Sequence, residues 1–195
     1  RPDAGSISVD GIPVAAPKPS RGTGAAAGTP RMLNRRQRER LRRTVGLVMQ
    51  HPERQLFADT VAEDVAYGPR NQHLDEAAVA QRGREALRLL RIGHLADRSP
   101  FDLSGGQRRL AAIAGVIACQ PAVLVMDEPT AGLDAAASAR IRELILDLRR
   151  RGVTTLIITH SRREARLLGA RIVTMPAAPA ADAATAVEAT GEGGN

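Results

Sequence analysis

The sequence predicts an α/β protein built on a parallel sheet, and three apolar runs carry that prediction. The runs are TVGLVMQ (44–50), AVLVMDE (122–128) and TTLIITH (154–160). Nearly continuous β-branched and aliphatic runs of this length are typical of strands that are buried on both faces of a sheet. Segments with helical periodicity separate the three runs, and strands that alternate with helices pair in parallel.

The chain before the first run predicts a short strand, an insertion and a basic helix. Residues 6–10 (SISVD) are expected to form a strand that turns at Gly11. Residues 13–30 are rich in proline, glycine and alanine, so we expect a flexible insertion there. Residues 31–43 hold seven arginines, which favours a solvated helix that leads into the next strand. Contact with nucleic acid, phospholipid headgroups or acidic protein is the alternative, although no aromatic residues interleave for base stacking.

Two amphipathic helices are expected between the later strands, and both have recognisable ends. Asp75 is expected to cap a helix that ends at Gly93, and Asp134 a helix that ends at Gly152. The second helix places four apolar side chains on one face: Ile141, Leu144, Ile145 and Leu148. Residues 176–195 contain too few apolar side chains to offset the entropy of ordering them, so we expect a disordered tail.

Composition limits the class of protein. The 195 residues suffice for one domain with loose ends, and the net charge of +7 comes almost entirely from arginine. The single cysteine, Cys119, excludes an intramolecular disulfide and suits a reducing compartment. No apolar run approaches the roughly 18 to 20 residues that span a bilayer, and no signal-peptide pattern is present.

The stretch LSGGQRR (103–109) predicts a helix start with an exposed backbone. Ser104 and Gln107 have the spacing of a capping box. Gly105 and Gly106 lie in the first turn, where each glycine costs about 1 kcal/mol relative to alanine. Uncovered N–H groups at the positive end of a helix dipole can hold an anion such as phosphate.

Each predicted strand ends in polar side chains: Gln50, then Asp127 with Glu128, then His160. Ligands bind at the carboxyl ends of strands in open parallel sheets, so we expect these residues to converge. Taken singly, each has an ordinary alternative as a loop start, a turn cap or a strand-end histidine. An acidic residue that closes an apolar strand suits Mg²⁺ binding in phosphoryl transfer, and a second carboxylate can orient or deprotonate water.

Together, LSGGQRR, VLVMDEPTAGLD and TLIITH resemble the ATP-binding cassette (ABC) ATPases, in the order that the family shows, over about residues 8–175. The resemblance implies a P-loop NTPase-like core with a parallel sheet and a helical signature subdomain, as one nucleotide-binding domain over residues 1–175. The stretch MQHPERQLFADTVAEDVAYGPRN and the later AIAGVIA are similar to ATPase subunits of energy-coupling factor transporters, which import cobalt, nickel or vitamins. Four residues of that stretch also suit ordinary core packing: Leu56, Phe57, Val61 and Val65.

The resemblance implies a role for each strand-end residue in binding and hydrolysing ATP with Mg²⁺. Gln50 and Asp127 correspond to the metal site, and Gln50 also to the coupling with a membrane subunit. Glu128 corresponds to the catalytic base, and His160 to the switch that contacts the γ-phosphate.

The resemblance also implies two partners. Ser104, Gly105, Gly106 and Gln107 correspond to the signature motif, which closes on ATP held by a second ABC ATPase subunit in a homodimer or heterodimer. Asp134 corresponds to the loop that crosses between the subunits. A transmembrane coupling subunit is the other implied partner, which places the chain peripherally at the cytoplasmic face of the membrane. No nucleic-acid partner is expected.

The P-loop of the family, G-x-x-x-x-G-K-[ST], is absent from the sequence. The candidate GTGAAAGTP (22–30) lacks a lysine after Gly28, and Lys18 is the only lysine. We therefore expect an N-terminally truncated ABC core that is inactive alone. An incomplete copy of an active importer ATPase is favoured because the other catalytic positions are intact. The alternative is a degenerate, non-hydrolytic subunit that supplies only the signature face; a nucleic-acid-associated cassette protein is disfavoured because no heptad run occurs.

Overall fold

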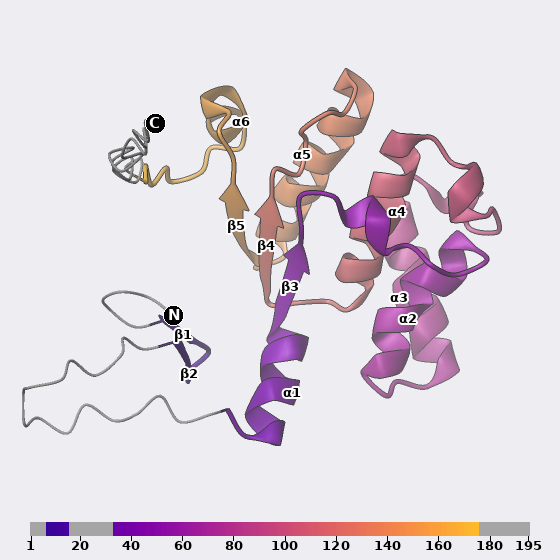
Figure 1. Cartoon of the computed structure of the whole chain (residues 1–195), viewed down its shortest axis with the longest axis horizontal. Coiled ribbons are helices and arrows are strands. Elements are labelled where there is room, and N and C mark those ends of the chain that lie inside the picture. Colours follow the sequence, from indigo (N-terminus) through magenta and orange to yellow (C-terminus); the bar gives the residue numbers. More distant parts are fainter. Residues whose placement is uncertain (1–6, 16–32, 176–195) are drawn as a thin grey trace, which may run out of the picture.

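The computed structural model describes residues 7–15 and 33–175 (Figure 1). The expected tail at 176–195, the P-loop candidate at 22–30 and Lys18 lie outside the described residues. The predicted insertion lies there too, except for its first residues. Pro13 and Val14 belong to β2 (Ile12–Ala15), which pairs antiparallel with β1 (Ile7–Val9), so the insertion was predicted to begin too early.

A parallel sheet of three strands, in the order β3-β4-β5, organises the larger described segment. The strands are β3 (Val45–Val48), β4 (Val123–Asp127) and β5 (Thr154–Ile158), which confirms the three predicted strands with slightly shorter bounds. Val48 pairs with Met126, and Met126 pairs with Ile157. Because the strands are parallel and in register, their carboxyl ends lie at one edge of the sheet (Figure 1).

Helices fill the connections between the strands. Helix α1 (Arg35–Thr44) leads directly into β3, as the sequence predicted. Six helical segments join β3 to β4: η1 (Pro52–Gln55), α2 (Val61–Asn71), α3 (Glu76–Leu89), η2 (Gly93–Leu95), η3 (Pro100–Asp102) and α4 (Gly105–Ala118). Helix α5 (Ala135–Arg150) joins β4 to β5, and α6 (Arg162–Leu167) follows β5.

The predicted helix starts are confirmed. The hydroxyl of Ser104 accepts a hydrogen bond from the Gln107 N–H at 3.3 Å, and the Gln107 side chain accepts one from the Ser104 N–H at 3.0 Å. Asp75 and Asp134 each accept a hydrogen bond from the N–H three residues ahead, at 2.8 and 2.7 Å. Each of these contacts satisfies N–H groups that have no partner inside the helix.

The predicted end of α3 at Gly93 is wrong, whereas the predicted end of α5 at Gly152 is confirmed. Helix α3 ends at Leu89, and Arg91 takes the left-handed conformation with φ +55°. This earlier turn carries Ile92, which is fully buried, into the core. Gly152 follows α5 with φ +83°, a conformation that favours glycine.

The core lies between one face of the sheet and a layer of helices. Helix α4 packs against α2 and α3, and α5 lies behind the sheet (Figure 1). On the sheet, Val48, Leu124 and Met126 are fully buried. The predicted apolar face of α5 is confirmed, because all four of its residues are buried: Ile141, Leu144, Ile145 and Leu148.

The prediction that every strand is buried on both faces is wrong. Leu47 is 53% exposed, Leu156 57% and Ile158 53%. Leu47, Val125 and Leu156 are neighbours in the register and form a row across the sheet. No helix within residues 7–15 and 33–175 covers this row. The apolar runs make both faces of the sheet apolar, but the described helices cover only one of them.

We expect Leu156→Thr to reduce binding of an apolar fluorescent dye and to reduce self-association. The free energy of unfolding should change by less than about 0.5 kcal/mol, since an exposed side chain loses little packing. Leu124→Ala, on the buried face of the same sheet, is the matched control and should cost about 2–5 kcal/mol. Equal losses in urea unfolding for the two variants would show that the Leu156 face is covered.

Candidate functional site

The structure brings Glu128 and His160 together at the carboxyl edge of the sheet. Oε1 of Glu128 accepts a hydrogen bond from the His160 backbone N–H at 2.8 Å and lies 2.6 Å from Nδ1 of the His160 ring. Oε2 accepts a hydrogen bond from the Thr159 hydroxyl at 3.2 Å. The Glu128 carboxylate is therefore held by three donors from the segment that follows β5, 31 and 32 residues further along the chain.

The register of the sheet explains why Glu128 lies next to Thr159 and His160. Asp127, the last residue of β4, pairs with Ile158, and the Glu128 N–H donates to the Ile158 carbonyl at 2.9 Å. Glu128 then turns out of the sheet with φ +45°. This conformation costs a residue other than glycine about 1–2 kcal/mol, so other contacts must hold it.

Arg109 supplies those contacts, and the sequence did not predict its role. Its guanidinium, from the second turn of α4, donates to the Glu128 carbonyl at 2.5 Å and to the Ala131 carbonyl at 2.9 Å. The residue is only 5% exposed. A fixed fork of donors suits two carbonyl acceptors on one turn. The one feature of the sequence that could have indicated this role is the position of Arg109, which directly precedes the apolar run beginning at Leu110.

Hydrogen bonds determine the charge state of Glu128. Burial acts to raise the pKa of its carboxyl, but the N–H, the ring and the charge of His160, with the Thr159 hydroxyl, lower the pKa below its ordinary value. Glu128 is therefore an ionised carboxylate at neutral pH, with acceptor oxygens only.

Asp127 and Gln50 leave the sheet at the same edge. Asp127 is half-buried and Gln50 is exposed, and neither side chain makes a hydrogen bond to the described residues. Within those residues, no group of three or more His, Cys, Asp or Glu side chains could hold a metal ion alone. Mg²⁺ usually takes one or two protein carboxylates and completes its shell with water and phosphate oxygens. A carboxylate and an amide oxygen that leave the same edge of the sheet suit an ion whose other ligands are water and phosphate oxygens.

The start of α4 presents an open backbone. Ser104 and Gly105 are exposed, and neither Gly105 nor Gly106 has a positive φ. A Cβ atom placed on Gly105 would meet nothing within 4 Å, and one placed on Gly106 would lie 3.8 Å from Leu133 and Ala137. The described fold therefore accounts for neither glycine. Asp134, which caps α5, is also exposed.

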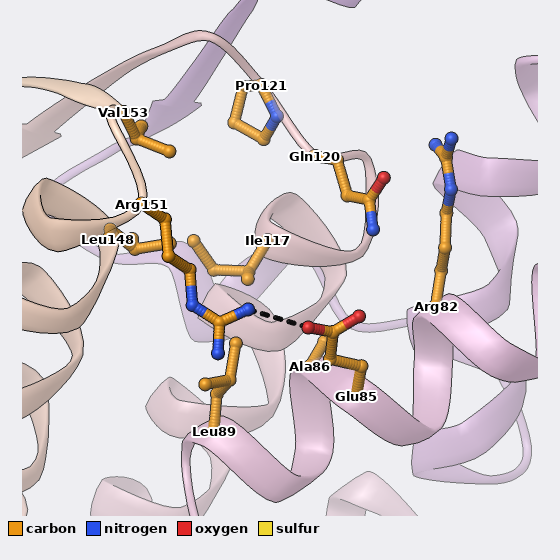
Figure 2. Close-up of a pocket in the computed structure, with 10 residues that line it drawn as sticks. All are labelled: Arg82, Glu85, Ala86, Leu89, Ile117, Gln120, Pro121, Leu148, Arg151 and Val153. Carbon is orange, nitrogen blue, oxygen red and sulfur yellow. Dashed lines mark hydrogen bonds and ion pairs between the residues drawn. The ribbon is translucent and has the colours of Figure 1, made fainter.

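None of the polar strand-end residues lines either of two hollows that lie among the helices. One, of about 250 Å³, lies between α3, α4 and α5 and is spanned by an ion pair of 2.7 Å between Arg151 and Glu85 (Figure 2). None of the predicted site residues lines it. The other, about 330 Å³ and here called the α2/α4 groove, is lined by residues that include Arg42, Leu56, Phe57, Tyr67, Gly68, Ala111 and Gly115.

The structure distinguishes between core packing and surface exposure for residues of the stretch that resembles energy-coupling factor ATPases. Val61 and Val65 are fully buried and belong to the core. Phe57 is 59% exposed and meets the ring of Tyr67 edge to face, with ring centres 4.9 Å apart. Core packing therefore accounts for the two valines but not for Phe57.

The parallel sheet with polar strand ends and an open helix start is the fold class of P-loop-type nucleotide-binding domains. Residues 1–131 match the family model described as ABC transporter, and the chain belongs to that family. It is 66% identical over 180 residues to an ABC transporter ATP-binding protein of Bifidobacterium longum, a match that covers 92% of this chain and 23% of that protein. It is 43% identical over 143 residues to the energy-coupling factor transporter ATP-binding protein EcfA of Methanocaldococcus jannaschii, a match that covers 73% of this chain and 51% of that protein.

Solved structures confirm the fold class. CbiO1 of Clostridium perfringens, part of the ABC transporter complex cbiONQ, superposes with a TM-score of 0.60 at 40% identity, over 66% of this chain and 51% of that one. A dimeric ATP-binding cassette bound to ADP and phosphate shares the fold, with a TM-score of 0.67 at 24% identity over 86% of this chain and 67% of that one. The chain spans 23% and 51% of the lengths of the two curated relatives described above. Within the described residues, no helix is long and apolar enough to cross a membrane.

Arg109→Ala should lower the free energy of unfolding by about 1–3 kcal/mol, because two carbonyls of the loop after β4 lose their donors. Arg109→Lys should recover only part of the loss, since an ammonium group lacks the planar fork. Arg163→Ala, which removes an exposed arginine from α6, is the control and should change stability by less than about 0.5 kcal/mol. Urea unfolding provides the measurement, and equal stability of all three variants would remove Arg109 from the site.

Stability should depend on pH through Glu128. Because its folded-state pKa lies below the ordinary value of 4.5, the ionised side chain stabilises the fold at neutral pH. That contribution declines as the pH falls below the unfolded-state pKa and is lost below the folded-state pKa. The difference in unfolding free energy between the unchanged chain and Glu128→Gln should therefore be constant near neutral pH and shrink as the pH falls below the unfolded-state pKa. Asp59→Asn is the exposed control, and a pH-independent difference for Glu128→Gln would contradict the assignment.

Proposed function

We propose that this chain is part of the ATP-hydrolysing subunit of an ABC importer of the energy-coupling factor type, which powers uptake of a metal ion or a vitamin. The family is established by the match over residues 1–131, and several relatives are energy-coupling factor ATPases. The observation that carries the proposal is the Glu128 carboxylate held 2.6 Å from the His160 ring at the carboxyl edge of the sheet.

In the proposed reaction, Glu128 acts as the general base. Its ionised carboxylate would accept a proton from the water that attacks the γ-phosphate, while the bond from the γ-phosphorus to the bridging oxygen breaks and ADP leaves with that electron pair. His160 orients the carboxylate through two contacts, and it would contact the γ-phosphate of bound ATP. Asp127, with Gln50, would hold Mg²⁺, which neutralises phosphate charge when bound.

The proposed partner for the signature motif is a second ABC ATPase subunit. Ser104, Gly105, Gly106 and Gln107 would bind the phosphate of ATP held by that subunit, with Asp134 beside them. The open backbone supports this proposal, because the described fold accounts for neither glycine and N–H groups at a helix start favour anions.

The α2/α4 groove is the proposed docking site for a transmembrane coupling subunit. The residues that line it include the exposed rings of Phe57 and Tyr67 and small residues of α2 and α4. Small residues allow the backbone of a docked segment to approach closely, and exposed aromatic residues are enriched in protein interfaces. Docking there would place the chain peripherally at the cytoplasmic face of the membrane.

The second candidate function is a non-hydrolytic subunit that contributes only its signature face. The observation that favours it is the absence of G-x-x-x-x-G-K-[ST] from the 195 residues. Both candidates imply that residues 1–195 alone do not hydrolyse ATP. They differ once a P-loop segment is joined to the chain, because only the first then makes Glu128 essential.

The test joins a P-loop segment to residues 1–195 and compares two variants in MgATP. Glu128→Gln should lower kcat by at least about 10²-fold, the usual size of a general-base contribution, and should accumulate an ATP-bound dimer. Gly106→Asp should remain monomeric, because a carboxylate would stand where the partner's phosphate docks. ATPase assays and size-exclusion chromatography measure both outcomes.

Gly106→Ala is the matched control, because a Cβ atom at this position stays 3.8 Å from its neighbours. Gly106→Ala should still dimerise. Loss of the dimer in Gly106→Asp alone would then be caused by the added charge and not by the loss of glycine from the helix. A dimer from Gly106→Asp together with only monomer from Glu128→Gln would overturn the assignment of both residues. Unchanged kcat in Glu128→Gln would favour the non-hydrolytic alternative.

A further inference from the structure

Helix α1 concentrates the positive charge of the chain. Its ten residues hold six arginines and one glutamate, which gives the helix a net charge of +5, compared with +7 for all 195 residues. All six arginines are exposed, and no residue of α1 is buried. None of the proposed catalytic or nucleotide-binding roles uses these side chains.

Few carboxylates balance this charge. Glu39 pairs with Arg35 at 3.1 Å, and Asp10 of the β1/β2 hairpin pairs with Arg40. The other four arginines form no ion pair with a carboxylate among residues 7–15 and 33–175: Arg36, Arg38, Arg42 and Arg43. Most of the positive charge of α1 is therefore available to an external anion.

A capping box at Asn34 stabilises the start of the helix, but the helix buries no side chain of its own. It is ten residues long, and isolated helices of that length are marginal in water. Arginines at positions 36 and 40, and at 38 and 42, repel each other one turn apart. Within the described residues, α1 packs mainly against β3. An anionic surface that approached the helix would relieve the repulsion without requiring an apolar face.

The position of α1 indicates which anion it meets. Arg42 lines the α2/α4 groove, and Arg42 and Arg43 line an adjoining hollow of about 450 Å³ with His73. If the groove receives the membrane subunit, as proposed above, this end of α1 lies on the membrane side. Leu41 is the only large apolar residue of the helix, so α1 suits contact with headgroups rather than insertion.

We propose that α1 binds the anionic phospholipid headgroups of the membrane surface beside the α2/α4 groove. The orientation of α1 rests on the proposed function, whereas its binding to lipid does not. Clusters of four to eight basic residues next to a membrane are attracted to anionic lipid, and this attraction falls off within about 10 Å at 0.1 M salt. Headgroup phosphates can accept the paired donors of a guanidinium.

The experiment measures flotation of the 195-residue chain with phosphatidylcholine vesicles that contain or lack phosphatidylglycerol. Binding should require phosphatidylglycerol and should be lost as salt is raised. The triple variant Arg36→Gln, Arg38→Gln, Arg42→Gln should bind on the order of 10²-fold more weakly. The matched control, Arg84→Gln, Arg88→Gln, Arg163→Gln, removes the same charge from exposed positions on α3 and α6 and should bind as the unchanged chain does.

The triple variant Arg36→Lys, Arg38→Lys, Arg42→Lys keeps the charge and should retain most of the binding. It therefore distinguishes lost charge from unfolding of α1. Equal losses in the two glutamine variants, or binding to phosphatidylcholine alone, would overturn the proposal. Tighter binding to duplex DNA than to the anionic vesicles would overturn it in favour of a nucleic-acid surface. The vesicles contain neither nucleotide nor membrane subunit, so these outcomes are independent of the ATPase tests.

Discussion

In-register parallel pairing of β3, β4 and β5 is the constraint on which the candidate site depends. It brings three segments that are far apart in the sequence to one edge of the sheet, where Gln50, Asp127, Glu128 and His160 all leave it. A slip of one residue would turn the side chains of a strand to the opposite face. The buried side chains of Val48, Leu124 and Met126 on one face of the sheet therefore fix the register as well as the core.

Much of the fold could be predicted because local patterns encode it. Apolar runs marked the strands, and capping residues marked the starts of α3, α4 and α5 by hydrogen bonds within one turn of the chain. The meeting of Glu128 and His160 also followed from the sequence, since parallel strands that end in polar residues must present them at a common edge. Their distance and the three donors on Glu128 did not follow.

The features that the sequence could not predict depend on parts of the chain far from the residue concerned. Arg91 takes a left-handed turn before Gly93 because Ile92 has to enter the core. Leu47 and Leu156 are exposed although both belong to apolar runs. An apolar run indicates that both faces of a strand are apolar, but it does not indicate whether other elements cover both faces. The fork of Arg109 on Glu128 joins residues 19 apart through tertiary packing alone.

The same two hydrogen bonds of Arg109 connect the start of α4 to the turn that carries Glu128. Arg109 lies within two turns of Ser104 on one helix, and its guanidinium holds the backbone of Glu128. A displacement of the helix start must either carry the Glu128 turn along or break two hydrogen bonds. A ligand that moves the first turn of α4 would therefore change the affinity of the Glu128 turn for its own ligand, and a ligand at that turn would change the affinity at the start of α4 by the same factor.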